Sequence, residues 1–166
     1  MYFHKVIKFN LLNQFNLNLL TKITAALIFL FISNVNLAQN KGSKNLNLLS
    51  SNVAVLDYDV VSYFSGTPTE GRESIKSEVL GVVYYFSSEQ NKTFFDKNPK
   101  RYIPKYGGWC AYAMAKGEQV EVNPEAYLIQ NDSLYLFFKT YFINTQTKWQ
   151  AQPEFFQEKA DANRNQ

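Results

Sequence analysis

A single cysteine, Cys110, most limits the folds open to this chain of 166 residues. It has no second cysteine to pair with, so no internal disulfide can hold the fold, and stability must come from a hydrophobic core. The one histidine, His4, falls within an N-terminal segment that has the features of a signal peptide. The mature protein therefore lacks the Cys and His ligands of a zinc site and the histidine base of Ser-His-Asp and Cys-His enzymes, and those classes are excluded.

Residues 1–38 are predicted to be the signal peptide. Three lysines precede an apolar run from Ile23 to Ile32, which is too short to span a bilayer. We expect cleavage after Ala38, where no nearby cysteine is available to carry a lipid anchor. The alternative is an uncleaved interfacial anchor. The sequence thus predicts an exported protein, periplasmic or secreted, with no stable membrane insertion after cleavage.

The charge of the mature part gives no support to a nucleic-acid partner. All 14 acidic residues follow residue 38, where they are balanced by 11 Lys and 3 Arg. A chain without a basic stripe has little electrostatic attraction for phosphates. The basic pI of about 8.8 results from the lysines of the signal segment.

The length and composition of the mature part indicate one domain. Removing 38 of 166 residues leaves 128, within the range of a single domain, and the chain has 14 Phe and 11 Tyr to build a core. Residues 39–52 are rich in Asn, Ser, Lys and Leu and are expected to form a flexible arm. The domain is expected to cover residues 53–164.

Local patterns predict an α+β fold in which β-hairpins pack against short helices. Hairpins are expected at 78–86, turning near Gly81, and at 127–138, turning at Asn131-Asp132. A helix is expected at 89–98, capped by Ser87 or Ser88, with Phe94 and Phe95 facing the core. The remaining expectations are an ordered loop at 99–109, a short helix at 110–115 ended by Gly117, and two short helices in 144–163 separated at Pro153.

Five motifs occur in order along the chain and together resemble the secreted members of the YHS-domain family. They are Asp57–Phe64, Tyr84–Phe94, Asn98–Tyr102, Tyr106–Ala113 and Asn123–Ala126. The family is described as metal-binding, and its secreted members have no assigned activity. The resemblance implies a treble-clef-like hairpin and helix. Ser87 and Ser88 stand where the metal-linked branch of the family has a Cys-Ser pair.

The segment around Gly107 and Gly108 is the candidate ligand site. Glycine lets the backbone approach a ligand closely, and neighbouring rings can form the walls of a pocket. The residues assigned to this site are Tyr106, Gly107, Gly108, Trp109, Cys110 and Tyr112. The alternative is a tight turn surrounded by core rings.

Two further pairs are candidate metal ligands. Cys110 and Met114 are four residues apart, so on a helix both sulfurs share a face and can offer soft ligands to Cu(I); the alternative is that both pack in the core. Asp57 and Asp59 share a face of a strand and can ligate a hard metal or form an acid-base pair. For these carboxylates the alternative is that one caps the next turn.

No set of residues forms a catalytic constellation, so the protein is not expected to be an enzyme. We expect an extracytoplasmic ligand-binding or metal-associated accessory domain, taking a soft metal ion or a small ligand, with no cofactor identified. The first alternative is a structural or protein-interaction domain without a small-molecule site. The second is a redox enzyme that works through an exposed Cys110 thiolate.

Overall fold

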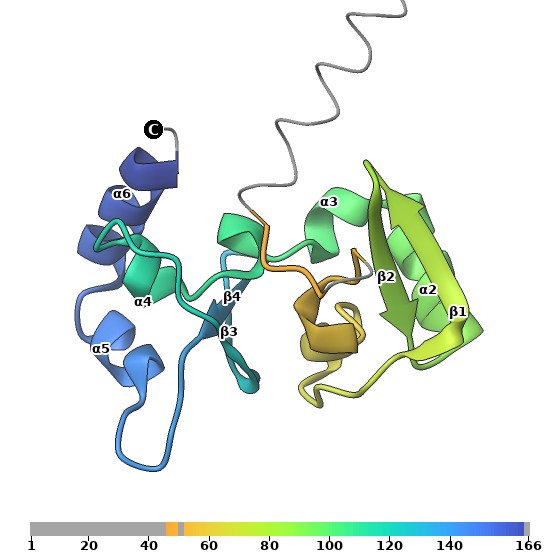
Figure 1. The fold of residues 1–166 in the computed structure, drawn as a ribbon, viewed down its shortest axis with the longest axis horizontal. Helices are drawn as coiled ribbons and strands as arrows, with labels where there is room; N and C mark the ends of the chain where they lie inside the picture. The colour runs from red at the N-terminus through yellow and green to blue at the C-terminus, as the bar shows by residue number, and fades with distance from the viewer. Residues whose placement is uncertain (1–45, 50–51, 165–166) are drawn as a thin grey trace, which may run out of the picture. The chain divides into compact units, whose positions relative to one another are not determined.

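Two antiparallel hairpins form the sheets of the described part of the protein (Figure 1). The computed structural model describes residues 46–49 and 52–164. Strand β1 (Arg72–Val79) pairs with β2 (Val82–Phe86), and β3 (Asn123–Gln130) pairs with β4 (Ser133–Phe137). Both hairpins turn through two residues with positive φ, Leu80-Gly81 and Asn131-Asp132, as type I′ turns require. The α+β fold class and both expected hairpins are confirmed.

Each hairpin begins earlier in the chain than its apolar pattern predicts. The pairing extends back to Arg72 in β1 and to Asn123 in β3, where the register shifts before regular pairing starts at Lys76 and Tyr127. A bulge of this kind interrupts the two-residue alternation of side chains. The first residues of both strands are mostly polar, and for these two reasons the pattern does not identify them.

Five short α-helices follow or separate the hairpins within residues 52–164 (Figure 1). The first is capped as expected, because Ser88 Oγ accepts a hydrogen bond from the Asn91 backbone N–H at 3.2 Å. Pro153 stands at the start of the last helix, which confirms the expected separation of two C-terminal helices. The helices are α2 (Glu89–Lys97), α3 (Pro99–Tyr102), α4 (Ala111–Met114), α5 (Thr145–Ala151) and α6 (Pro153–Arg164).

Two details of the helical region differ from expectation. Phe95 is fully buried but Phe94 is 43% exposed, because neighbouring side chains on a helix point about 100° apart and only one of them can face the core. The expected loop at 99–109 is regular in part: it contains α3 and a 3₁₀ turn, η4 (Lys105–Gly108). Pro99 starts α3 because its fixed φ suits the first turn of a helix, so a residue read as a breaker acts as an initiator.

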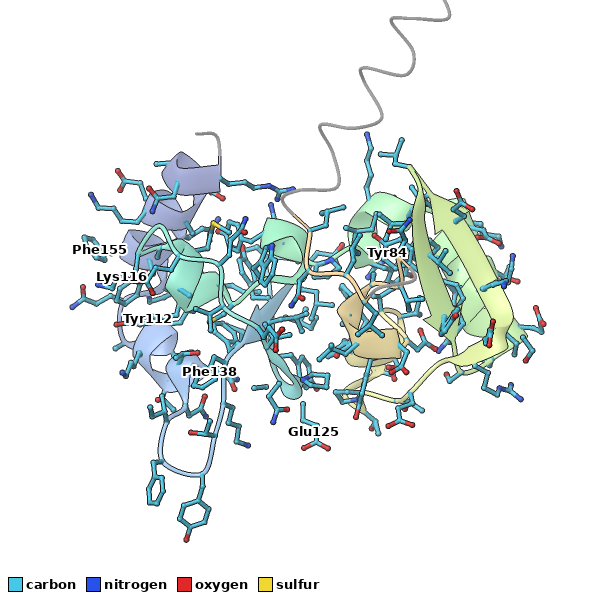
Figure 2. All side chains as sticks on the ribbon, in the orientation of Figure 1. Tyr84, Tyr112, Lys116, Glu125, Phe138 and Phe155 are labelled. Atoms are coloured by element: carbon cyan, nitrogen blue, oxygen red, sulfur yellow. The ribbon has the colours of Figure 1, made fainter. Side chains whose placement is uncertain are left out.

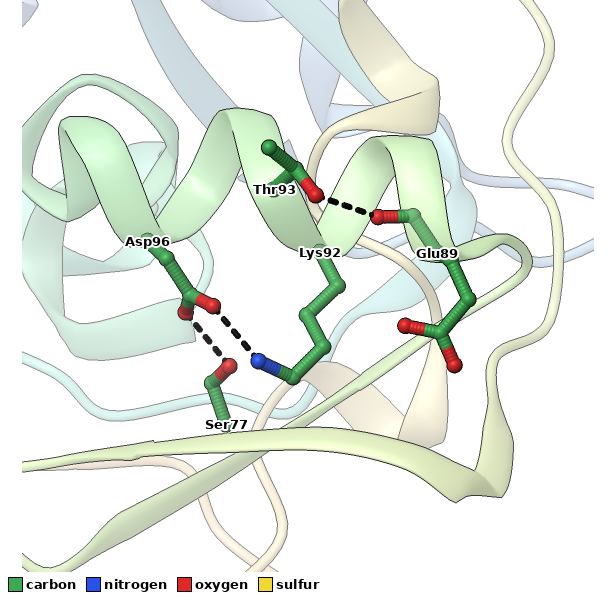
Figure 3. A network of polar contacts seen from close by, with 5 residues as sticks. All are labelled: Ser77, Glu89, Lys92, Thr93 and Asp96. Atoms are coloured by element: carbon green, nitrogen blue, oxygen red, sulfur yellow. Dashed lines mark hydrogen bonds and ion pairs between the residues drawn. The ribbon is translucent and has the colours of Figure 1, made fainter.

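Helix α2 is joined to β1 by a small polar network (Figure 3). Ser77 Oγ donates to Asp96 Oδ1 at 2.5 Å, and Lys92 Nζ contacts Asp96 Oδ2 at 2.5 Å. Within the helix, Thr93 Oγ1 donates to the Glu89 carbonyl at 2.8 Å. The hydrogen bonds from Lys92 and Ser77 lower the pKa of Asp96. Because the pair is solvent-exposed, it positions the helix more than it stabilises the fold.

Strand β4 connects two groups of buried side chains. Successive side chains of a strand point to opposite faces. Leu134 and Leu136 lie in the first core, with Val60, Phe86 and Phe95, whereas Tyr135 and Phe137 lie in the second core, with Tyr106, Trp149 and Ala160. The strand is therefore buried on both faces, and the two cores share it as a common wall.

The chain segment Leu46–Leu49 lies against the domain. Leu48 pairs with Ala54 in an antiparallel bridge, and the backbone N–H of Asn47 donates to the Gly107 carbonyl at 2.8 Å. These four residues and Asn52 are the described part of the expected arm; the signal peptide and arm residues 39–45, 50 and 51 lie outside the described residues. Between residues 46 and 49 and between 52 and 164, no helix is long and apolar enough to cross a membrane.

Candidate functional site

The backbone at the expected ligand site turns through three left-handed residues in a row. Tyr106, Gly107 and Gly108 have φ of 58°, 67° and 87°. Glycine adopts this conformation freely, whereas Tyr106 does so at a cost of roughly 1–2 kcal/mol. Surrounding contacts must therefore hold Tyr106 in place.

Those contacts make Tyr106 a core residue rather than the wall of a pocket. Its ring is buried, with centroids 6.0 Å from Tyr135 and 6.4 Å from Trp149, and its hydroxyl donates to Asp161 Oδ1 on α6 at 3.1 Å. Burial, and then the nearby Asp161 carboxylate, raise the pKa of the Tyr106 hydroxyl well above its ordinary value. The ring thus fastens the turn to α6.

Another segment of the same chain packs closely against the two glycines. Asn47 donates from its backbone to the Gly107 carbonyl and from Nδ2 to the Gly108 carbonyl at 3.2 Å. A Cβ atom on Gly108 would lie 3.6 Å from the Cβ of Asn47. The site that the glycines prepare is therefore filled by Leu46–Leu49.

One small cavity borders this segment, and it is too small for a ligand. Its volume is about 20 Å³, and Leu46, Leu48, Val55, Tyr84 and Gly107 are among the residues that line it. A space of this size holds about one water molecule, and its lining is almost wholly apolar. Of the six residues expected to form the site, Gly107 alone lines this cavity.

The Cys110 thiol is buried and fully hydrogen-bonded. Its Sγ accepts from the Phe138 backbone N–H at 3.3 Å and lies 3.4 Å from Thr145 Oγ1. Because Thr145 Oγ1 donates its one hydrogen to the Phe138 carbonyl at 2.8 Å, the thiol is the donor toward Thr145. Cys110 therefore joins α5 to the end of β4, and it does not provide the exposed thiolate that the redox alternative requires.

Met114 and Cys110 do not form the expected soft-metal pair. Cys110 precedes α4 as its N-cap, with φ −57° and ψ 118°, so the i, i+4 spacing does not place both sulfurs on one helical face. Cys110 lies in the first core and Met114 in the second. Among the residues that the structure describes, no group of three or more His, Cys, Asp or Glu side chains is arranged to hold a metal ion.

Trp109 and Tyr112, the other two residues of the expected site, lie at the edge of the second core. Tyr112 packs edge-on against Phe156 with centroids 5.0 Å apart, and the Lys116 and Lys148 ammonium groups lie 5.6 and 5.7 Å from its ring centroid. Figure 2 shows Tyr112, Lys116 and Phe155 close together on the α4 and α6 side. Trp109 Nε1 is buried without a hydrogen-bond partner within the described part of the chain. Neither ring faces the small cavity.

Asp59 is a buried carboxylate that accepts five hydrogen bonds. It is completely buried and accepts from the backbone N–H groups of Val61, Ser62 and Ser87, from Ser87 Oγ at 2.6 Å and from Asn91 Nδ2 at 2.7 Å. Asp57 is only half-buried. The capping alternative is confirmed for Asp59, since its carboxylate closes the turn at Val61 and Ser62 and also fixes the entry to α2.

The most exposed rings lie in the loop that joins β4 to α5, a feature that the sequence reasoning missed. Tyr141 is 94% and Phe142 is 90% exposed, and their rings meet edge-on with centroids 4.9 Å apart. The Thr140 backbone N–H donates to the Ile143 carbonyl at 2.8 Å, and the Ile143 N–H donates back to Thr140 Oγ1 at 3.2 Å. These bonds close a tight turn, here named the aromatic tip (Thr140–Ile143). The sequence does contain a signal for this loop. The apolar run Tyr141-Phe142-Ile143 comes after the end of the predicted hairpin at 127–138, so it cannot belong to either of its strands.

Comparisons with protein-family models, with curated proteins and with solved structures found no match for this chain.

Proposed function

We propose that this protein is an exported accessory domain that docks on another surface through its aromatic tip, rather than one that holds a small ligand or a soft metal. The observation that carries the proposal is the nearly complete exposure of Tyr141 and Phe142. The export part of the proposal rests on the signal-peptide features of residues 1–38.

The contrast with the other aromatic residues supports an external role for the tip. The domain buries the rings of Tyr63, Phe86, Phe137 and Trp149 almost completely. Leaving two neighbouring rings in water forgoes the free energy of burial that these residues gain. Exposed aromatic side chains of this kind are typical anchors of binding surfaces.

The turn geometry also favours binding. Two hydrogen bonds between Thr140 and Ile143, together with the bridge between Lys139 and Asn144, close the tip into a tight turn. A pre-organised loop loses less conformational entropy when it binds than a loose one. The expected ligand segment, by contrast, is occupied by the chain's own Asn47 and by core contacts.

Hydroxyl-radical footprinting tests the proposal on the unmodified protein. Adding the envelope fraction of the host, membranes with their proteins, should reduce oxidation of Tyr141 and Phe142. Leu80, which is 99% exposed at the turn of the other hairpin, is the internal control and should stay reactive. Equal reactivity of Tyr141 and Phe142 with and without the fraction would contradict the proposal.

A matched pair of variants tests the same point by sedimentation. Tyr141→Ser combined with Phe142→Ser should lower the amount of protein that sediments with the envelope fraction. Leu80→Ser removes an equally exposed apolar side chain from the turn of a hairpin and should have no effect. A similar loss in both variants would point to non-specific hydrophobic adhesion and would contradict docking through the tip.

A further inference from the structure

We infer that the surface recognised by the aromatic tip is the interface of an anionic lipid bilayer. This inference rests on the proposed function, because it names the partner of the same loop. Four features carry it: the chemistry of the tip, its small area, the charge of the chain around it, and its reach.

The residues of the tip suit the boundary between lipid and water. Phe142 and Ile143 are wholly apolar, whereas Tyr141 combines an apolar ring with a polar hydroxyl, and such amphipathic rings concentrate at headgroup depth. Tyr141 and Phe142 are both almost fully exposed and their ring centroids are 4.9 Å apart, so both rings can enter the interface together. No shape-matched pocket is needed for this mode of binding.

The size of the tip favours a bilayer over a protein partner. A stable protein interface buries roughly 800 Å² on each side, with an apolar centre surrounded by a polar rim. Here the exposed apolar side chains are three consecutive residues, and Lys139, Thr140 and Asn144 adjoin them directly. An exposed apolar surface this small fits partial insertion into a lipid bilayer better than it fits a flat interface between proteins.

The lysine next to the tip complements anionic headgroups locally, although the mature part as a whole is charge-balanced. From Ser133 to Pro153 the sequence has two lysines, Lys139 and Lys148, and no acidic residue. Lys139 is exposed and directly precedes the tip, whereas the ammonium group of Lys148, on α5, lies 5.7 Å from the Tyr112 ring centroid. The two ion pairs found between described residues involve neither lysine. An exposed lysine beside an apolar tip strengthens attachment to anionic lipid.

The tip is too short to insert beyond the surface region of a membrane. Two rings and one aliphatic side chain can enter the headgroup region but cannot cross the hydrocarbon core. Binding of this kind is weak and reversible when a single apolar element acts alone, and a basic group adds to it. The expected behaviour is that of a peripheral protein that exchanges with solution.

Vesicle sedimentation tests the inference. The probes are vesicles of phosphatidylcholine and vesicles of phosphatidylcholine with phosphatidylglycerol, mixed with the protein as recovered from its host. Tyr141→Ser with Phe142→Ser should weaken binding to the anionic vesicles by about tenfold or more, because two buried rings are lost. Lys139→Gln should weaken binding to the anionic vesicles but not to the neutral ones, and Leu80→Ser should match the wild type. Equal binding by the wild type and the tip variant would overturn the inference.

Footprinting in parallel separates the failure of the inference from the failure of the proposed function. Protection of Tyr141 and Phe142 by the envelope fraction, without protection by either kind of vesicle, would overturn the lipid inference and leave a protein partner for the tip. Absence of protection in both experiments would reject the proposed function together with the inference. Protection by anionic vesicles that raised salt reverses supports both, since salt screens the lysine contribution.

Discussion

Replacing Asp59 by asparagine tests the network at the entrance of α2. The substitution keeps the shape of the side chain but turns one acceptor oxygen into a donor. The remaining carbonyl oxygen can still accept from Val61 and Ser62, but the new amide nitrogen then faces the backbone N–H of Ser87, which is fixed as a donor. The Ser87 hydroxyl and the Asn91 amide can reorient, and the Ser87 backbone cannot.

The expected loss of unfolding free energy in Asp59→Asn is about 3 kcal/mol. One buried donor left without a partner costs roughly 1–3 kcal/mol, and the surviving hydrogen bonds weaken because the acceptor is no longer charged. Urea denaturation followed by circular dichroism measures the difference. Asp57→Asn is the matched control, because Asp57 is half-buried two residues away, and it should change the free energy by less than about 0.5 kcal/mol. A loss below about 1 kcal/mol in Asp59→Asn, or an equal loss in the control, would refute the reasoning.

Three further predictions concern the expected site and its surroundings. Cys110→Ser should lower the free energy of unfolding by roughly 1–3 kcal/mol in urea denaturation, because a hydroxyl replaces a buried sulfur, and a Cu(I) titration should be unchanged; weaker Cu(I) binding would restore the metal site. Asn47→Ala removes the side-chain bond to Gly108 and should cost about 1 kcal/mol, seen as a lower melting temperature; no change would mean that Leu46–Leu49 adds nothing to stability. Burial raises the pKa of the Tyr84 hydroxyl from 10.0 to about 12. The folded state is therefore stabilised by the protonated hydroxyl, and this stabilisation is complete below pH 10 and is lost as the pH rises through 12. Between pH 10 and 12 the melting temperature should fall less steeply with pH in Tyr84→Phe than in the wild type. The same dependence on pH in both proteins would contradict this.

The regular elements were predictable because their signals are local. Asn131-Asp132 and Leu80-Gly81 mark two-residue turns, Ser88 marks the start of a helix, and Pro153 marks a break between two helices, all within a few residues of the structure they set. Where the signal was local but open to two readings, as at Pro99, the prediction of a loop was wrong. The resemblance to the YHS-domain family stays a prediction.

The candidate site depended on contacts that no local pattern contains. Gly107 and Gly108 indicate a left-handed backbone, but the residue that occupies the space beside them, Asn47, is 61 positions away from Gly108. The Cys110 and Met114 spacing argument assumed one helix, and the helix begins one residue after Cys110. Sequence reasoning recognised that the turn was special and did not recover what fills it.

Alkylation of Cys110 can report local opening of the folded protein. Cys110 is the one thiol in the sequence, and it has no exposed surface. A small alkylating reagent can therefore reach the sulfur only after the surrounding contacts have opened, and these include the hydrogen bonds to Thr145 at the start of α5 and to Phe138 after β4. When closing is faster than alkylation, the labelling rate of the native protein equals the intrinsic rate multiplied by the open fraction. The rate then gives the free energy of the opening that exposes Cys110, without an engineered probe.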